Sequence, residues 1–183
     1  MRIIAGNLKG KNIKAPEGIA TRPTADRARE TLFDIISSYF LKRGQVWSNI
    51  VFADIFAGSG AVGIEALSRG ARQVVCMEND REALKFLKEN VRGLSAVRVM
   101  ENDALIPPRY QPVSVLFMDA PYGKGLWQQA LVAFSKNGWV DGKTLIIIET
   151  DKKLKEILPD GYDLLQERSA GRNTFLFAKR KEK

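Results

Sequence analysis

Residues 51–63 read VFADIFAGSGAVG, and this stretch decides the fold of the chain. Its first six residues are apolar apart from one aspartate, which is typical of a strand that is buried on both faces. The glycines at positions 58, 60 and 63 match the pattern G-x-G-x-x-G directly after that strand. Because residues 61–69 continue with helical spacing until Gly70, the stretch predicts a strand, a tight turn that a ligand can approach, and a helix.

The same alternation continues toward the C-terminus. Strands are predicted at 73–78, 96–101, 113–118 and 144–149, helices at 81–91 and 125–137, and a hairpin at 162–168 and 173–179. Strands that alternate with helices of about ten residues indicate an α/β fold with a mainly parallel sheet covered on both faces. Such sheets bind ligands at the carboxyl ends of their strands.

A different pattern precedes the sheet. Residues 2–5 and 11–15 alternate around Gly6–Gly10, which predicts a small β-hairpin, and Thr24 is placed to cap a helix that runs to about Arg43. We therefore expect two parts. Residues 1–44 form an N-terminal hairpin and helix extension, and residues 45–183 form the α/β domain.

The chain has 183 residues with no histidine and one cysteine. These counts exclude Ser-His-Asp and Cys-His catalysis, histidine-ligated metals and cysteine-cluster metal sites, so no metal is expected. The apolar runs are shorter than the roughly 20 residues of a membrane span, and the start does not resemble a signal peptide. We expect a cytoplasmic protein with no membrane partner, and a monomer by default.

The net charge of +8 is unevenly distributed. Residues 1–50 carry nine bases and four acids, residues 151–183 carry nine and six, and the centre is balanced. Basic ends around a neutral centre favour a polyanionic partner such as nucleic acid, although surface lysines can also serve solubility alone.

Three acids lie at predicted strand ends and indicate the class of cofactor. Glu78 follows Gly58 by twenty residues, where a carboxylate can accept both ribose hydroxyls of an adenosine-containing cofactor. Asp54 near the glycine turn would repel a pyrophosphate, so a cationic ligand such as S-adenosylmethionine is favoured over a dinucleotide. Asp103 can accept a hydrogen bond from an adenine amino group, or can simply cap a turn.

The tetrapeptide Asp119-Ala120-Pro121-Tyr122 follows the fourth predicted strand. An exocyclic amine on a base is a poor nucleophile because its lone pair is delocalised into the ring. Acceptors on its N–H groups bend the nitrogen toward tetrahedral geometry, and the Asp119 carboxylate and the Ala120 carbonyl can supply them. Tyr122 can stack on an extruded base. The alternative is an acidic turn beside a core tyrosine.

With these motifs in place, the sequence resembles the class I S-adenosylmethionine-dependent amino-methyltransferases. More specifically, it resembles the bacterial small-subunit rRNA guanine-N2 methyltransferases of the RsmD type. The likeness rests on MRIIAG at 1–6, TRPTADRARE at 21–30, FAGSG at 56–60, EALSRGA at 65–71 and DAPY at 119–122. It covers most of the chain.

The resemblance implies a Rossmann-like, seven-stranded, mostly parallel sheet whose last strand is antiparallel. It also implies methylation of one guanine N2 in 16S rRNA, either free or in a partly assembled 30S subunit. Its implied site residues form three groups. The cofactor group is Asp54, Phe56, Gly58, Ser59, Gly60, Glu78, Asp103 and Ala104, the catalytic group is Asp119, Ala120, Pro121 and Tyr122, and the RNA group is Arg22, Thr24, Arg27 and Arg29.

The chain departs from the family pattern at two places. Ala120 stands where a first proline is usual, but Pro121 already restricts Ala120 to extended backbone and the carbonyl is kept. Near the C-terminus, Gly171-Arg172-Asn173-Thr174 replaces the usual Tyr-Gly-x-Thr.

Three other functions are weighed against this interpretation. An adenine-N6 DNA methyltransferase shares an Asp-Pro-Pro-Tyr-like motif, and a non-catalytic RNA-binding protein could keep the same fold. A nicotinamide-dependent oxidoreductase is disfavoured by Asp54 and by the length of the chain. A cytosine-C5 methyltransferase needs an exposed cysteine, whereas Cys76 lies among apolar residues of a predicted strand.

Overall fold

A computed structural model describes residues 1–16, 23–121, 125–154 and 157–181, and it describes the side chains of the first helix from residue 26 onward. The helices of this part of the chain are α1 (Pro23–Leu41), η1 (Trp47–Asn49), α2 (Ala61–Ser68), α3 (Arg81–Asn90) and α4 (Leu126–Lys136). The strands are β1 (Val51–Ile55), β2 (Gln73–Met77), β3 (Val97–Met100), β4 (Val115–Met118), β5 (Leu145–Asp151), β6 (Tyr162–Ala170) and β7 (Asn173–Arg180).

Within the described residues these strands form one sheet of seven, in the order β3-β2-β1-β4-β5-β7-β6. Strands β1 to β5 pair in parallel, and β7 is antiparallel to both of its neighbours, β5 and β6. Every residue of β1 and β4 is buried, as expected for central strands covered on both faces. The Rossmann-like sheet predicted from the sequence, with its last strand antiparallel, is therefore confirmed.

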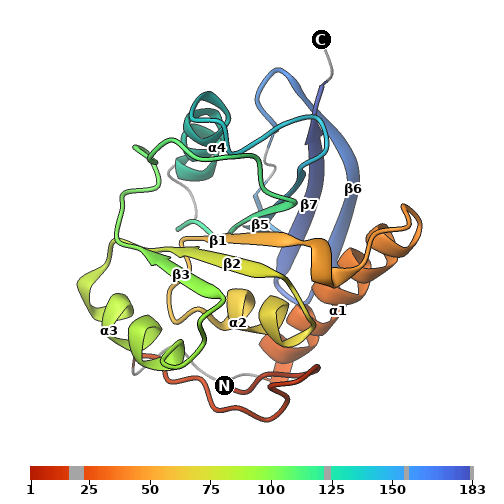
Figure 1. Cartoon of the computed structure of the whole chain (residues 1–183). Coiled ribbons are helices and arrows are strands. Elements are labelled where there is room, and N and C mark those ends of the chain that lie inside the picture. Colours follow the sequence, from red (N-terminus) through yellow and green to blue (C-terminus); the bar gives the residue numbers. More distant parts are fainter. Residues whose placement is uncertain (17–22, 122–124, 155–156, 182–183) are drawn as a thin grey trace.

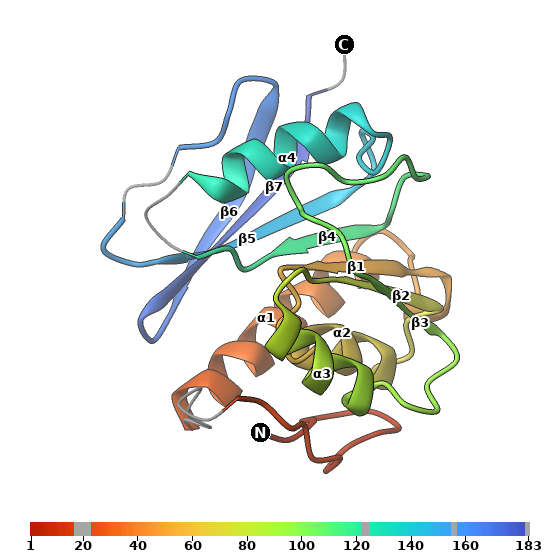
Figure 2. The same cartoon turned by 90° about the vertical axis from the view of Figure 1, so that its left-hand side faces the viewer.

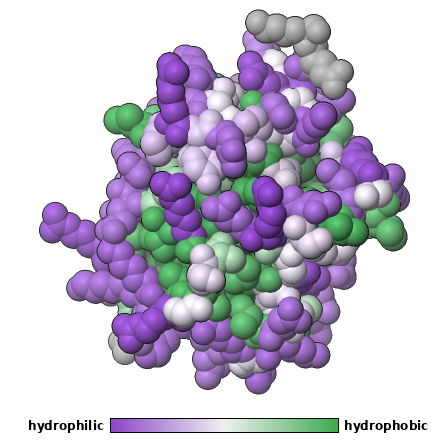
Figure 3. Space-filling view, in the orientation of Figure 1, coloured by the Kyte–Doolittle hydropathy of each residue, from purple (hydrophilic) through white to green (hydrophobic). Residues whose placement is uncertain are grey.

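The sheet separates two layers of helices. Helix α4 packs on one face, and α1, α2 and α3 lie on the other, as Figures 1 and 2 show from two directions. Trp127 and Phe134 of α4 belong to the core of the first face, whereas Leu32 and Phe33 of α1 belong to the core of the second. Figure 3 shows hydrophilic side chains around the periphery of one outer surface and a hydrophobic area near its centre.

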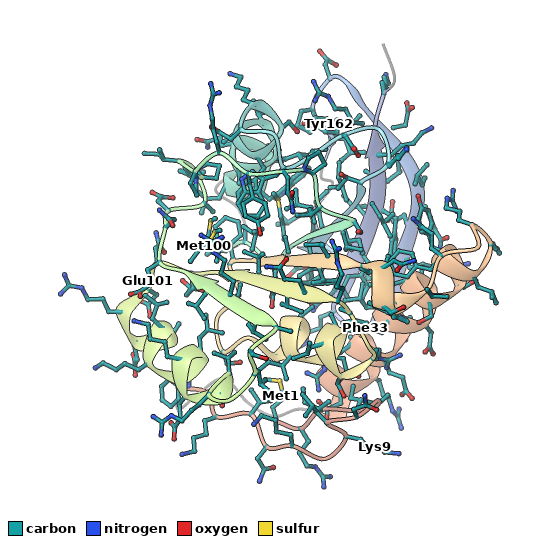
Figure 4. All side chains as sticks on the ribbon, in the orientation of Figure 1. Met1, Lys9, Phe33, Met100, Glu101 and Tyr162 are labelled. Carbon is teal, nitrogen blue, oxygen red and sulfur yellow. The ribbon has the colours of Figure 1, made fainter. Side chains whose placement is uncertain are left out.

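Strands β6 and β7 form the long hairpin that the sequence predicts at the C-terminal end. Tyr162, labelled in Figure 4, begins β6, and its hydroxyl lies 2.5 Å from Ser135 Oγ of α4. This contact joins the hairpin to the helix layer on the α4 face.

The N-terminal hairpin is shorter than the sequence suggests. Its two runs pair through one antiparallel bridge, between Arg2 and Asn12, and do not form regular strands. The backbone N–H of Ile3 donates to Lys11 O at 3.1 Å, and that of Ile13 donates to Met1 O at 2.8 Å. The backbone N–H groups of Ile4 and Ala5 donate to Glu65 of α2 and that of Lys14 donates to Asn90 of α3, so they are not available for a longer ladder.

Glu65 of α2 anchors the N-terminal segment to the sheet domain. Its side chain is fully buried, and its two carboxylate oxygens accept from Ile4 N at 2.7 Å and from Ala5 N at 3.1 Å. Arg69 Nε also donates to this carboxylate, at 2.9 Å. The segment, red in Figure 1, consequently lies against α2 on the side away from the sheet.

Candidate active site

A cavity of about 240 Å³ lies at the carboxyl ends of β1, β4 and β5, where helix α1 and Met1 cover them. Its floor includes Phe117 and Phe175 of the sheet, and its α1 wall includes Ala28, Arg29 and Leu32. The glycine turn after β1 supplies a further side, made by Phe56, Ala57, Gly58 and Ser59. This is the edge of the sheet at which the sequence predicts a ligand.

Asp54 reaches the cavity from within β1. It is 2% exposed, and its Oδ2 accepts a 2.8 Å hydrogen bond from the backbone N–H of Gly63 in α2. Burial raises the pKa of Asp54 to about 8. The Gly63 hydrogen bond opposes that rise, and the nearby carboxylates of Asp119 and Glu78 add to it. A cationic group in the cavity would therefore be attracted to Asp54 and would favour its ionised form.

The glycine turn has the backbone that its sequence requires. Phe56 has φ of 62°, which is rare for a residue with a side chain, and Gly58 and Gly60 have φ of 54° and 80°. A Cβ on Gly60 would lie 2.5 Å from Leu87 Cδ1, whereas a Cβ on Gly58 would meet nothing within 4 Å. The turn is thus packed against α3 at Gly60 and leaves open space at Gly58.

Glu78 holds this turn from the neighbouring strand end. Its Oε2 accepts from Gly58 N at 2.8 Å, and its Oε1 accepts from Asn79 N at 2.8 Å and from Asp80 N at 2.9 Å. Both lone pairs of Oε1 are used by these bonds, whereas Oε2 keeps one lone pair for a hydroxyl donor.

Asp103 and Ala104 follow β3, two strands away from β1 in the sheet. Asp103 is exposed, and its Oδ1 accepts from Leu105 N at 2.8 Å, which makes it a turn residue in this structure. Ala104 is buried in the core on the α4 face. The described lining of the cavity includes neither residue.

The predicted catalytic tetrapeptide begins where β4 ends. Asp119 is exposed, lines the cavity, and donates its backbone N–H to Ile55 O at 3.4 Å. Ala120 is 3% exposed, and Pro121 is exposed. Tyr122 lies outside the described residues. The structure thus brings Asp119 to the same cavity as Asp54 and the glycine turn.

Two polar side chains of the cavity, those of Glu149 and Asn173, were not identified as site residues from the sequence. Glu149 of β5 lines the cavity, and Asn173 of β7 donates a side-chain N–H to Glu149 Oε1. Burial and the carboxylates of Asp119 and Asp54 raise the pKa of Glu149 well above its usual value, while the Asn173 hydrogen bond opposes the rise. The sequence did contain a signal for Glu149, because this acid is the last residue of the apolar strand predicted at 144–149. That strand ends at the edge of the sheet where Asp54 and Asp119 were already expected.

The four residues predicted to contact RNA are placed differently from one another. Arg22 and the side chain of Thr24 lie outside the described residues, and Arg27 is exposed on α1. Arg29 is only 6% exposed and donates to Arg2 O at 2.7 Å and to Asp26 Oδ1 at 3.0 Å. These contacts give Arg29 a structural role between α1 and the N-terminal segment, and its burial argues against a surface phosphate contact.

Cys76 is fully buried in β2, and burial raises the pKa of its thiol well above the usual value. The prediction that it packs in the core rather than acting as a nucleophile is confirmed. Among the described residues, no group of three or more acids or cysteines is arranged to hold a metal ion. A search of the same residues finds no helix with the length and apolarity needed to cross a membrane.

Comparison with known proteins finds relatives that match most of this chain. "Ribosomal RNA small subunit methyltransferase D" of Haemophilus influenzae is 34% identical over 93% of this chain and 89% of its own. The protein of the same name in Escherichia coli K12 is 32% identical over 93% of this chain and 85% of its own. The solved structure of the Escherichia coli protein yhhF superposes with a TM-score of 0.83, at 29% identity, over 100% of this chain and 99% of that one. The profile of one family, described as Conserved hypothetical protein 95, matches residues 1–179, and the chain belongs to that family.

Proposed function

We propose that this protein transfers a methyl group from S-adenosylmethionine to the exocyclic N2 of one guanine in small-subunit rRNA. The observation that carries the proposal is the cavity at the ends of β1 and β4, where Asp119 faces the space next to the glycine turn. Two relatives at 34% and 32% identity bear the name of a small-subunit rRNA methyltransferase, which supports RNA as the substrate.

The residues around the glycine turn fit S-adenosylmethionine. Gly58 leaves open space beside the turn, and Glu78 Oε2, which also accepts from Gly58 N, has one lone pair available for a ribose hydroxyl. Asp54 would supply a negative charge for the cationic methionine part, Phe56 and Ser59 line the cavity, and Gly60 completes the turn with a φ of 80°. Asp103 and Ala104 would bind adenine if the cofactor extends beyond the cavity toward β3. When bound, the cofactor would supply an electrophilic methyl group on a sulfonium sulfur, and that sulfur would keep the electron pair of the broken methyl C–S bond as a neutral thioether.

The chain's own contribution to the reaction is positioning of the amine. The Asp119 carboxylate and the Ala120 carbonyl accept the two N2–H groups, which directs the nitrogen lone pair at the methyl carbon. The nitrogen forms the new bond with that lone pair and afterwards releases one proton, for which Asp119 is an acceptor. Pro121 restricts the backbone of Ala120 to extended conformations and so fixes the direction of the Ala120 carbonyl. Tyr122 would stack on the guanine.

Substrate RNA is attracted by the basic ends of the chain. Residues 1–44 would contact RNA, chiefly through Arg22, Thr24 and Arg27, while residues 45–183 hold the cofactor and the reacting amine. The proposed enzyme is a cytoplasmic monomer that acts on 16S rRNA or on a partly assembled 30S subunit.

Mass spectrometry of rRNA from a strain that lacks the gene, before and after addition of the purified protein, is the decisive test. One guanine should gain one methyl group on N2. Methyl transfer to adenine in DNA would favour the DNA-methyltransferase alternative. Calorimetry that detects no affinity for S-adenosylmethionine would favour a non-catalytic RNA-binding protein.

The variant Asp119→Ala tests the mechanism. Methyl transfer should fall by roughly 100-fold or more because an acceptor for the amine is lost, while the affinity for S-adenosylmethionine stays within about twofold in calorimetry. Asp160→Ala is the matched control, since Asp160 is exposed in the loop before β6. Full activity in Asp119→Ala would rule the mechanism out.

A further inference from the structure

Glu149, two residues before the end of β5, lies beside Asp119, which directly follows the adjacent strand β4. Strands β4 and β5 are parallel, and Met118 pairs with Ile148, so Asp119 and Glu149 occupy the next position of the same register. Side chains alternate between the faces of a strand, so Asp119 shares the face of Phe117, and Glu149 shares the face of Ile147. Both apolar residues belong to the core on the α1 side. The two acids therefore point into one cavity, and both line it.

The surroundings of Glu149 do not balance its charge. Its Oε1 accepts from the Asn173 side chain, but Oε2 accepts no hydrogen bond from the described residues, and none of their lysines or arginines forms an ion pair with it. A carboxylate in such a place loses hydration without full compensation. An N–H donor in the cavity would give Oε2 a hydrogen-bond partner and would favour the ionised form of Glu149 over the protonated form that its burial favours.

Guanine has such donors next to each other on one edge. Its N1–H group is adjacent to the N2 amine, so a base that presents N2 to Asp119 presents N1–H to a neighbouring acceptor. Adenine has an unprotonated N1 that would face a carboxylate lone pair to lone pair. Two carboxylates side by side thus fit the guanine edge and oppose the adenine edge.

We infer that Glu149 is a specificity-determining residue whose Oε2 accepts the N1–H of the target guanine while Asp119 holds the N2 amine. Asn173 is its positioning residue, because the amide that occupies Oε1 fixes the direction of Oε2. This inference rests on the proposed function, and it adds the group that distinguishes guanine from other bases that carry an amine.

Two rRNA substrates that differ only at the methylated nucleotide test the inference. One carries guanine, and the other carries 2-aminopurine, which keeps the 2-amino group but has no proton on N1. At a pH where Glu149 is ionised in the guanine complex, which a pH–rate profile identifies, the wild-type protein should prefer guanine by roughly 100-fold or more in kcat/KM, because the analogue offers the carboxylate no N–H donor. In Glu149→Gln the amide can donate to N1 of the analogue, so the preference should narrow by roughly tenfold or more.

Matched measurements separate specificity from folding. Glu149→Ala, which has neither an acceptor nor a donor, should lose activity on guanine and change little on 2-aminopurine. Glu82→Gln makes the same chemical change at an exposed position of α3 and should leave both rates unaltered. Circular dichroism of each variant checks that the fold is kept.

The outcomes also separate this inference from the proposed function. If the wild-type protein methylates a guanine but the Glu149 variants keep the wild-type preference, or lose both activities equally, Glu149 does not read N1 and the inference is wrong. If no guanine is methylated by the wild-type protein, the proposed function fails and the inference fails with it.

Discussion

The buried Asp54 carboxyl group, which we propose attracts the cofactor, lowers the stability of the folded protein when it ionises. In the unfolded chain it ionises near its ordinary pKa of 3.8, whereas burial keeps it protonated in the folded protein up to about pH 8. Between these values folding takes up a proton, so the free energy of unfolding falls as the pH rises. The contribution of Asp54 to stability is greatest below pH 3.8 and is lost above about pH 8.

Replacement of Asp54 by Asn should therefore stabilise the protein in a pH-dependent way. The amide oxygen can still accept from Gly63 N, and the ionisation is gone. Ionisation of the buried carboxyl costs about 1.4 kcal/mol per pH unit above 3.8, so we expect a gain of about 4 kcal/mol at pH 7, or roughly 8–16 °C in Tm, that falls below about 1 kcal/mol at pH 4. Calorimetric scans of both proteins from pH 4 to 8 measure it. The exposed Asp160→Asn should show no trend, and a pH-independent difference for Asp54→Asn would contradict the assignment.

Individual residues also show which parts of the site can be predicted from the sequence. Asp54, Glu78 and Asp119 could be found because each closes a strand that the sequence itself marks. Glu149 closes a strand too, but its place beside Asp119 depends on the register between β4 and β5, which residue patterns alone do not specify. The burial of Arg29 likewise depends on how the N-terminal segment folds back on α1.

At the scale of elements, α2 can approach the sheet closely because Gly63 has no side chain. A Cβ at this position would lie 2.8 Å from Cys76 Sγ, 2.9 Å from Val74 Cγ1 and 3.2 Å from Asp54 Oδ2. The helix and both strands would have to separate, and that separation would also stretch the Asp54 hydrogen bond to Gly63. The third glycine of the motif thus serves packing, while the first leaves space beside the turn.

We expect Gly63→Ala to lower the free energy of unfolding by about 1–3 kcal/mol, as overpacked cores do. Denaturant unfolding measures the loss. In a Cys76→Ala background the closest atom is absent, so the same substitution should cost less, with a coupling of about 0.5 kcal/mol or more. Equal costs in the two backgrounds would show that contact with the Cys76 sulfur is not the cause.

On the scale of the whole molecule, the N-terminal segment connects the extension to the cavity. Glu65 accepts hydrogen bonds from Ile4 N and Ala5 N. Met1 lines the cavity, and Arg29 Nη1 donates to the sulfur of Met1 at 2.9 Å. Figure 4 shows Met1 and Lys9 on the N-terminal segment at this end of the molecule. The part of the chain proposed to bind RNA is therefore tied to the site that the RNA base would enter.

Loss of the Glu65 carboxylate should lower the stability of the protein and loosen the N-terminal segment. Glu65→Ala leaves Arg69 and two backbone N–H groups without their buried acceptor, so we expect the protein to lose about 3–5 kcal/mol of stability. Hydrogen exchange followed by mass spectrometry should show faster exchange in residues 3–13 than in β4, because the backbone N–H groups that Glu65 binds belong to that segment. Glu82→Ala, at an exposed position, should leave the pattern unchanged. Uniform acceleration across the sheet would mean that Glu65 supports the whole fold and that the N-terminal segment is not a separately anchored wall of the site.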